Sequence, residues 1–145
     1  MNGDLEWGWR TSFDHIGIVA DLGSGTELKA QALQGRTHMG YPMPVRRWID
    51  ERFRAAYVLV THPIGKVGLA ARLDAFDTRN RGSLWTGEYD EHGWSAMLAA
   101  KREFGRVTAL VEWLHVHSET PAREHAAGDE TQSQTQLQAE LRMHW

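Results

Sequence analysis

The sequence predicts an all-β fold, a single antiparallel, up-and-down sheet of about seven strands. Apolar residues recur at a spacing of two along most of the chain, and glycine- or proline-containing turns divide it into extended segments. A helical fold is a poor alternative because the polar positions do not recur at three and four residues. We treat all 145 residues as one structural unit, since this length suits one domain and is short for two.

The first two expected strands are 5–22 and 27–39. They are separated by the turn sequence LGSGT, whose glycines favour a tight reversal. In the second segment, Leu28 alternates with the charged residues Glu27 and Lys29. This alternation is typical of a strand with one apolar and one polar face.

The third and fourth expected strands are 49–61 and 67–77. The proline-containing stretch GYPMPVRRW before them predicts a loop, and the turn HPIGK separates them. In the third segment, Phe53 falls on one face and Arg52 and Arg54 fall on the other. From this alternation we expect the two arginines to lie on the polar face of the sheet.

The last three expected strands are 94–104, 107–117 and 136–145. The turn EFGR joins the first two, and the long polar stretch SETPAREHAAGDETQSQ precedes the third. Only AREHAAGDETQ within that stretch is suited to a short turn of helix. The final segment, QLQAELRMHW, alternates over all ten residues and ends in a tryptophan.

Composition excludes several classes of function. The formal net charge of -3, from 16 basic and 19 acidic residues, provides no basic surface for nucleic acid. The absence of cysteine excludes disulfides, cysteine-based zinc sites and thiol nucleophiles. The opening MNGDLEWGWR is not a secretory signal, and no run of about 18 apolar residues predicts a spanning helix. We expect no cofactor, no resident metal and no catalytic residues.

The connections point to a particular kind of sheet. Tight turns alternate with long polar connections at roughly 41–48, 78–92 and 118–133. One end of the sheet therefore carries only short turns, and the other carries only long loops. Transmembrane β-barrels have this asymmetry, together with strands that alternate between lipid-facing and lumen-facing residues. The sequence therefore favours a transmembrane β-barrel over a soluble sheet.

In such a barrel, the charged residues would face the interior and the tryptophans would lie at the membrane interfaces. The predicted pore-lining residues are Arg10, Arg52, Arg54, Arg72, Asp74, Lys101, Glu103, Glu140 and Arg142. The predicted aromatic girdle consists of Trp7, Trp9, Trp94, Trp113 and Trp145. Unpaired arginines would favour anions, whereas pairing with the nearby carboxylates would only keep a polar lumen satisfied.

The alternation that ends at Trp145 resembles the terminal strand by which Gram-negative outer-membrane barrels are recognised by their assembly machinery; these barrels usually end in Phe. RFRAAYVLVTHPIGKVGLAARLDAFDTRNRGS and HGWSAMLAAKREFGRVTALVEWLHVHSETPARE are similar to the last strands of porin-like proteins of the phosphate-selective porin O and P kind. The similarity covers about 5–145.

This resemblance implies a place in the bacterial outer membrane, with the lipid bilayer and the assembly machinery as partners. It also implies passive diffusion of small anionic or polar solutes and, as in many porins, a homotrimer. Members of the family are longer and carry a signal peptide. We therefore expect 1–145 to be the C-terminal segment of a larger barrel.

The main alternative is a soluble β-sandwich or small barrel that binds a carbohydrate or another small ligand through its tryptophans. A weaker alternative is a glycosidase that uses Glu88 and Glu112 as its carboxylate pair. His115 and His117 share a strand face, as metal ligands would, but we expect them at a barrel rim or at the base of a loop. Solvated loop charge is likewise favoured over a calcium site for Asp74, Asp77, Glu88, Asp90 and Glu91.

Overall fold

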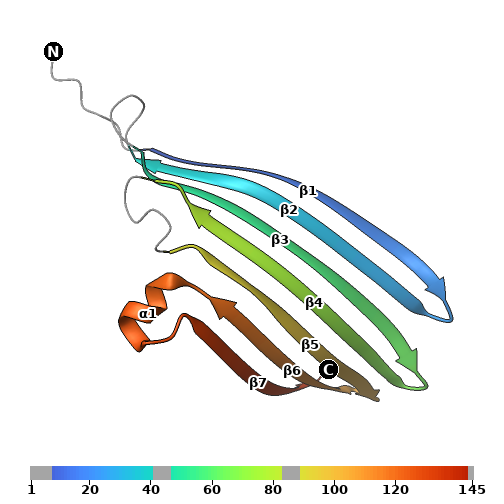
Figure 1. Cartoon of the computed structure of the whole chain (residues 1–145). Helices are drawn as coiled ribbons and strands as arrows, with labels where there is room; N and C mark the ends of the chain where they lie inside the picture. Colours follow the sequence, from blue (N-terminus) through green and yellow to red (C-terminus); the bar gives the residue numbers. More distant parts are fainter. Residues whose placement is uncertain (1–7, 41–46, 83–88, 144–145) are drawn as a thin grey trace.

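The computed structural model describes residues 8–40, 47–82 and 89–143, which form one seven-stranded sheet in sequential strand order (Figure 1). The strands are β1 (Gly8–Gly23), β2 (Thr26–Gly40), β3 (Arg47–Ile64), β4 (Val67–Asn80), β5 (Glu91–Phe104), β6 (Val107–Glu119) and β7 (Thr131–Met143). Each strand pairs antiparallel with the next, so the expected all-β, up-and-down architecture is confirmed. Within the described residues the sheet is open, with β1 and β7 at its edges.

The tight turns lie at one end of the sheet, as the sequence predicted (Figure 1). Glycines make these reversals feasible because Gly25, Gly65 and Gly105 have φ values of 75°, 60° and 61°, where a side chain would be strained. The end of β2, the start of β3, the end of β4 and the start of β5 lie at the opposite end of the sheet, together with the β6–β7 connection. The predicted asymmetry between the two ends of the sheet is therefore present.

A short helix, α1 (Pro121–Ala127), occupies the connection between β6 and β7; it begins one residue before the segment 122–132 for which the sequence allowed a helix and otherwise lies within it. Arg123 holds it against the sheet. Its guanidinium donates to the backbone oxygen of Ser118 (2.8 Å), to the Ser118 hydroxyl (2.8 Å) and to a carboxylate oxygen of Glu91 (2.7 Å). One side chain thus ties α1 to the ends of both β5 and β6.

Replacing Arg123 with alanine should release α1 from the sheet. The substitution leaves the Glu91 carboxylate without its cation and removes several charge-assisted hydrogen bonds, so we expect a loss of about 2 kcal/mol in local stability. Amide hydrogen exchange should accelerate over 118–131 and stay unchanged in β1 and β2. Arg123→Lys keeps the charge but loses the forked geometry, and should fall between the two. Unchanged exchange in Arg123→Ala would contradict this role.

The strand registers divide the side chains between two faces, named here the apolar face and the polar face. The apolar face carries Ile16, Ile18, Ala30, Ala32, Ala56, Val58, Val60, Leu69, Ala71, Leu73, Ala75, Trp94, Ala96, Leu98, Ala100, Val111, Trp113, Leu137, Ala139 and Leu141. The polar face carries Glu27, Lys29, Tyr57, Arg72, Asp74, Ser95, Lys101, Glu103, Glu112, Gln136, Gln138, Glu140 and Arg142, with several apolar residues among them.

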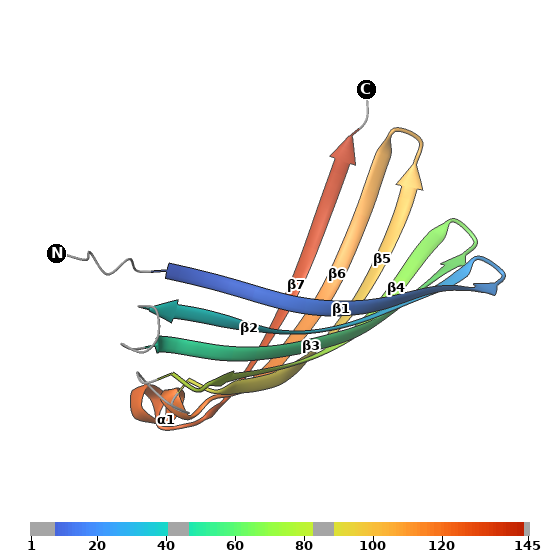
Figure 2. The ribbon, with the colours of Figure 1, turned by 90° about the horizontal axis from the view of Figure 1, so that it is seen from above.

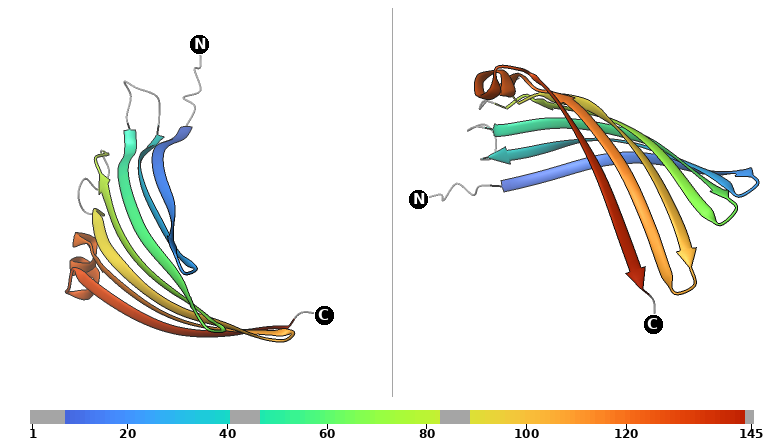
Figure 3. Two further views of the ribbon diagram at one scale, coloured as in Figure 1. Left: turned by 90° about the vertical axis from the view of Figure 1, so that its right-hand side faces the viewer. Right: turned by 90° about the horizontal axis from the view of Figure 1, so that it is seen from below.

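The apolar face is uncovered. No hydrophobic side chain is buried among the described residues, and Leu73, Leu98 and Leu137 are 64%, 56% and 74% exposed. The sheet is curved and strongly twisted, so that β1 and β7 point in different directions (Figures 2 and 3). On β3 and β4 the polar face is the more shielded one, as expected where side chains converge on the concave side of a curved sheet.

Two phenylalanines on the polar face cover glycines of neighbouring strands. Phe53 lies over Gly35 and Phe76 lies over Gly93, and each pair is directly opposed in the register. A methyl group at Gly93 would lie 2.7 Å from Phe76 Cζ and 2.9 Å from Ser118 Cβ, and would also collide with the His117 carbonyl oxygen. The rings thus fill space that the glycines leave empty and fix the register locally.

Candidate functional site

Ion pairs between residues two apart on one strand recur across the polar face. Each pair places a cation and a carboxylate side by side, because alternate residues share a face. The pairs are Lys29–Glu27 (2.8 Å), Arg72–Asp74 (2.5 Å), Lys101–Glu103 (3.0 Å) and Arg142–Glu140. The pairing alternative considered from the sequence therefore holds for Arg72, Lys101 and Arg142, and none of the three is an uncompensated cation.

Arg72 is the centre of a cluster that spans β3, β4 and β5. Its guanidinium carbon lies 4.3 Å from the centroid of the Tyr57 ring, and its Nε donates to Asp74 at 2.9 Å. The Ser95 hydroxyl donates to the same carboxylate at 3.1 Å. Four polar side chains on three strands are thus held in a fixed arrangement near the middle of the polar face.

Carboxylates outnumber cations on this face. Asp21, Glu51 and Glu112 lie on the polar parity of β1, β3 and β6, and none forms an ion pair within the described residues. The four paired cations are already matched by four carboxylates, so these three leave the strands of the face with a net negative charge. A surface of this sign attracts cations and repels anions.

Arg10, Arg52 and Arg54 do not share this face, so the sequence-based grouping of all the charged candidates on one face is wrong. In the strand register, Arg54 lies directly opposite Gln34 on β2 and Asp77 on β4. It shares its face of β3 with Ala56 and Val58, and this is the apolar face. Arg10 and Arg52 follow the same parity on β1 and β3. These arginines lie beyond the apolar stretch, towards the end of the sheet that carries the long connections.

Two of the predicted girdle tryptophans lie together on the apolar face. The Trp94 ring centroid is 5.3 Å from that of His115 and 5.8 Å from that of His117, and Trp113 stacks on His115 at 6.1 Å. Trp9 instead lies on the polar parity of β1, opposite Met39. Trp7 and Trp145 are outside the described residues.

The two histidines of this group are held by hydroxyl groups of β7. His115 Nδ1 is 2.8 Å from the Thr135 hydroxyl, and His117 Nδ1 is 2.9 Å from the Ser133 hydroxyl. Across 8–40, 47–82 and 89–143, no group of three His, Asp or Glu side chains could hold a metal ion. Glu88, the proposed partner of Glu112 in a glycosidase pair, lies outside the described residues.

A row of polar side chains ends the apolar face on the side of the long connections. Asp14, Gln34, Arg54, Asp77 and His92 are directly opposed on β1 to β5. The next row towards the tight turns consists of Ile16, Ala32, Ala56, Ala75 and Trp94. The change from polar to apolar side chains thus takes place within one row on these five strands.

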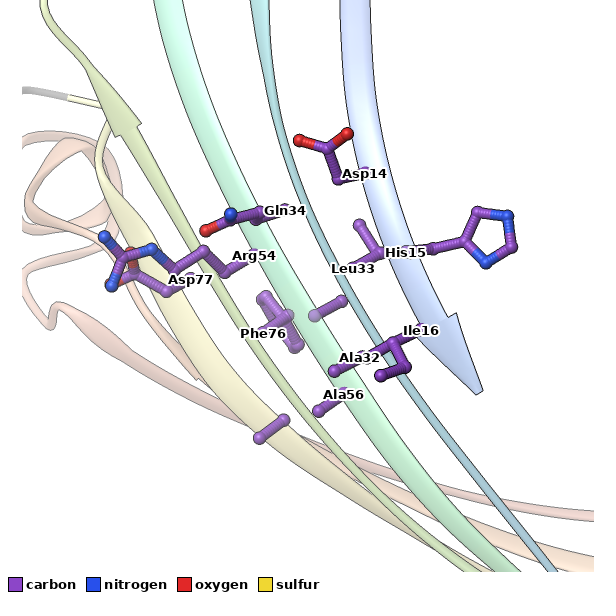
Figure 4. A pocket seen from close by; sticks show the side chains of 12 residues that line it. Asp14, His15, Ile16, Ala32, Leu33, Gln34, Arg54, Ala56, Phe76 and Asp77 are labelled. Carbon is purple, nitrogen blue, oxygen red and sulfur yellow. The ribbon is translucent and has the colours of Figure 1, made fainter. Parts of the chain in front are cut away.

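Two depressions meet at this boundary. One, of about 550 Å³, lies over the alanine positions and reaches Asp14, Gln34, Arg54 and Asp77 at its polar end (Figure 4). The other, of about 360 Å³, is lined by residues that include Ser12, Gln34, Arg36, Arg52 and Arg54. Asp14, Gln34 and Arg54 line both, so the two depressions are continuous.

No protein-family model, curated protein or solved structure matches the chain. Within the described part of the chain, no helix has the length and hydrophobicity needed to cross a membrane.

Proposed function

We propose that the sheet is part of the wall of an outer-membrane β-barrel, with its apolar face against lipid and its polar face along a passage for small polar solutes. The exposure of the apolar face carries this proposal. Burying one leucine contributes about 2 kcal/mol, and Leu73, Leu98, Leu137 and Leu141 are all more than half exposed. A bilayer would cover these side chains, while the backbone hydrogen bonds close within the sheet.

The size of the apolar face fits a bilayer. On β4 it extends from Val67 to Ala75 and ends at Asp77 and Arg79. Eight residue steps correspond to about 26 Å along the strand. The lipid-facing band of outer-membrane barrels is about 25 Å tall, and their strands are tilted, so the two lengths are comparable.

Successive hairpins are staggered as in the tilted wall of a barrel. Glu27 on β2 lies opposite Thr61 on β3. From this pair, β2 reaches its turn after one residue, at Thr26, whereas β3 reaches its turn after three residues, at Ile64. The β3–β4 turn is therefore two residues further along than the β1–β2 turn. Phe104 likewise lies two residues past Arg102, the partner of Val67.

Each hairpin is thus shifted by two residues relative to the one before it. This shift is about 7 Å along the strands for every two strands, which are about 10 Å wide. If the turns lie level with one another in the membrane, the strands tilt by about 35°. This angle is within the range found for membrane barrels. The stagger therefore supports the proposed wall independently of the distribution of apolar residues.

The charge of the polar face favours neutral and cationic solutes. The resemblance suggested small anionic or polar solutes, and the sequence placed five arginines in the lumen: Arg10, Arg52, Arg54, Arg72 and Arg142. Of these, Arg10, Arg52 and Arg54 lie on the other face, and Arg72 and Arg142 are paired with carboxylates. The carboxylates Glu51 and Glu112 instead add negative charge to the lumen side.

Reconstitution of the purified chain tests the proposal. We expect the chain to float with lipid vesicles in a density gradient, to resist extraction by urea, and to acquire its full β-sheet circular dichroism only in micelles or vesicles. A monodisperse, β-rich monomer in plain buffer that stays out of vesicles would contradict it. That outcome would favour a soluble sheet whose apolar face is covered by another part of the protein.

A further inference from the structure

The boundary of the apolar face combines an arginine-rich depression with an apolar trough. Ala32, Ala56 and Ala75 are directly opposed on β2, β3 and β4, and Ile16 and Trp94 continue the row at its two ends. Three small side chains between two large ones leave a trough across the strands. Figure 4 shows Gln34, Arg54 and Asp77 at its polar end and Ile16 and Ala32 along it.

Arginines face one another at the polar end. Arg52 is opposed to Arg36 on β2 and to Arg79 on β4, an arrangement that is unfavourable without an anion nearby. Arg36 is paired with the buried Asp50, and Arg79 with Asp77 at 3.1 Å. Arg52 has no ion pair within the described residues.

Arg54 also has no ion pair within the described part of the chain, although two carboxylates line the same depressions. Of these, Asp77 is taken by Arg79, and Asp14 forms no ion pair with a described residue. The lining of the two depressions therefore contains two guanidinium groups without an ion pair, those of Arg52 and Arg54, and one such carboxylate, that of Asp14. Its net charge is positive.

We propose that the two depressions form one binding site for a phosphorylated lipid, with the phosphate at Arg52 and Arg54 and an acyl chain in the alanine trough. This inference rests on the proposed function, because it requires the apolar face to meet lipid. The depth is appropriate: the arginines lie immediately beyond the apolar band, at the level of lipid headgroups. The phosphate is contacted from the outer side of the wall and not from the passage.

The chemistry favours phosphate on a lipid over a free anion. Arg52 and Arg54 lie two residues apart on one face, so their Cβ atoms are about 7 Å apart and their side chains can reach different oxygens of one phosphate. A guanidinium binds such oxygens through two parallel N–H groups. Free phosphate would leave the adjoining apolar trough empty, whereas a lipid fills both parts.

Binding of short-chain lipids to the full chain in a neutral maltoside detergent tests the site. We expect dioctanoyl phosphatidic acid to bind, and the Arg52→Gln/Arg54→Gln variant to bind it about tenfold more weakly. The matched control is Arg72→Gln/Lys101→Gln, which removes the same charge from the polar face and should leave binding unchanged. Circular dichroism in the same detergent confirms that each variant is folded.

Three comparisons identify what the site recognises. Dioctanoylglycerol, which lacks the phosphate, should bind at least tenfold more weakly, and inorganic phosphate should not compete at equal concentration. Equal binding of dioctanoylglycerol, or equally strong binding of inorganic phosphate, would overturn the proposal. Ala56→Leu, which fills the trough and leaves both arginines, should also weaken lipid binding, and an unchanged affinity would count against the trough.

The experiments distinguish a failure of the proposed lipid site from a failure of the proposed membrane insertion. Lipid binding is measured in micelles, so a chain that binds phosphatidic acid but stays out of vesicles contradicts membrane insertion alone. A chain that inserts into vesicles but does not distinguish phosphatidic acid from dioctanoylglycerol overturns the lipid site alone.

Discussion

If the sheet spans a bilayer as proposed, Leu98→Arg is expected to lower its stability in lipid by about 2–4 kcal/mol, because the substitution places a charge near the middle of the apolar face. Leu98 lies on the apolar face between Trp94 and Phe104 and is 56% exposed. In a soluble protein, replacing an exposed leucine with arginine would have little effect on stability. Equilibrium unfolding by urea in lipid vesicles measures the difference.

The matched control is Ala99→Arg, one residue further along β5 and on the polar face. Ala99 is opposed to Glu112, so the new guanidinium has a carboxylate within reach and should be tolerated. A large loss for Leu98→Arg with a small change for Ala99→Arg supports lipid contact. Equal effects of the two substitutions would mean that the two faces meet the same environment.

Gly93→Ala is expected to destabilise the sheet by about 3 kcal/mol. The added methyl group would collide with the His117 carbonyl oxygen and approach Phe76 Cζ to 2.7 Å, so either β6 or the ring must move. Gly17→Ala is the matched control, because its nearest neighbour would be the Ala30 carbonyl oxygen at an ordinary 3.5 Å.

Thermal or urea unfolding in the same detergent compares the two glycine variants. Loss of stability confined to Gly93→Ala supports the packing of Phe76 over the glycine. A second substitution, Phe76→Ala, should partly restore the Gly93→Ala variant, because it removes one of the three close contacts that the added methyl group would make. If Gly93→Ala were as stable as Gly17→Ala, the close packing of β4, β5 and β6 at this point would be wrong.

The strand pattern was predictable wherever one face was apolar and the other polar. In β5, the alternation of Trp94 and Leu98 with Ser95 and Lys101 gives the same faces as the register. Glycine-containing turns and the short helix could also be read from local sequence. These features depend on neighbours in the chain, so the sequence alone contains the information.

The position of the arginines on β3 could not be read in the same way. This strand has large apolar side chains on both parities, with Tyr57 and Leu59 on one and Val58 and Val60 on the other. Pairing with β4 places Val58 directly opposite Leu73. Only this pairing shows which of the two sets of alternate residues on β3 lies on the apolar face. Long-range register, and not local alternation, places Arg52 and Arg54.

The beginning of β7 was also placed too late, at 136, whereas the strand starts at Thr131. Residues 131–136 are all polar, because the strand here lies beyond the apolar band and both of its faces carry polar side chains. Alternation disappears where neither face is apolar, although the backbone pairing with β6 continues to Glu119. Strand ends outside the band therefore leave no signal in the hydrophobic pattern.

The number of strands in the sheet limits how its edges can be joined. Each neighbouring pair is antiparallel, so β1 and β7, six pairings apart, both run from the end of the sheet with the long connections to the end with the tight turns, although the twist sets them at an angle. Rotationally related copies of this sheet placed edge to edge would meet at parallel seams, which bacterial single-chain barrels do not contain. A barrel closed by antiparallel pairing alone must add an odd number of strands to the seven described here.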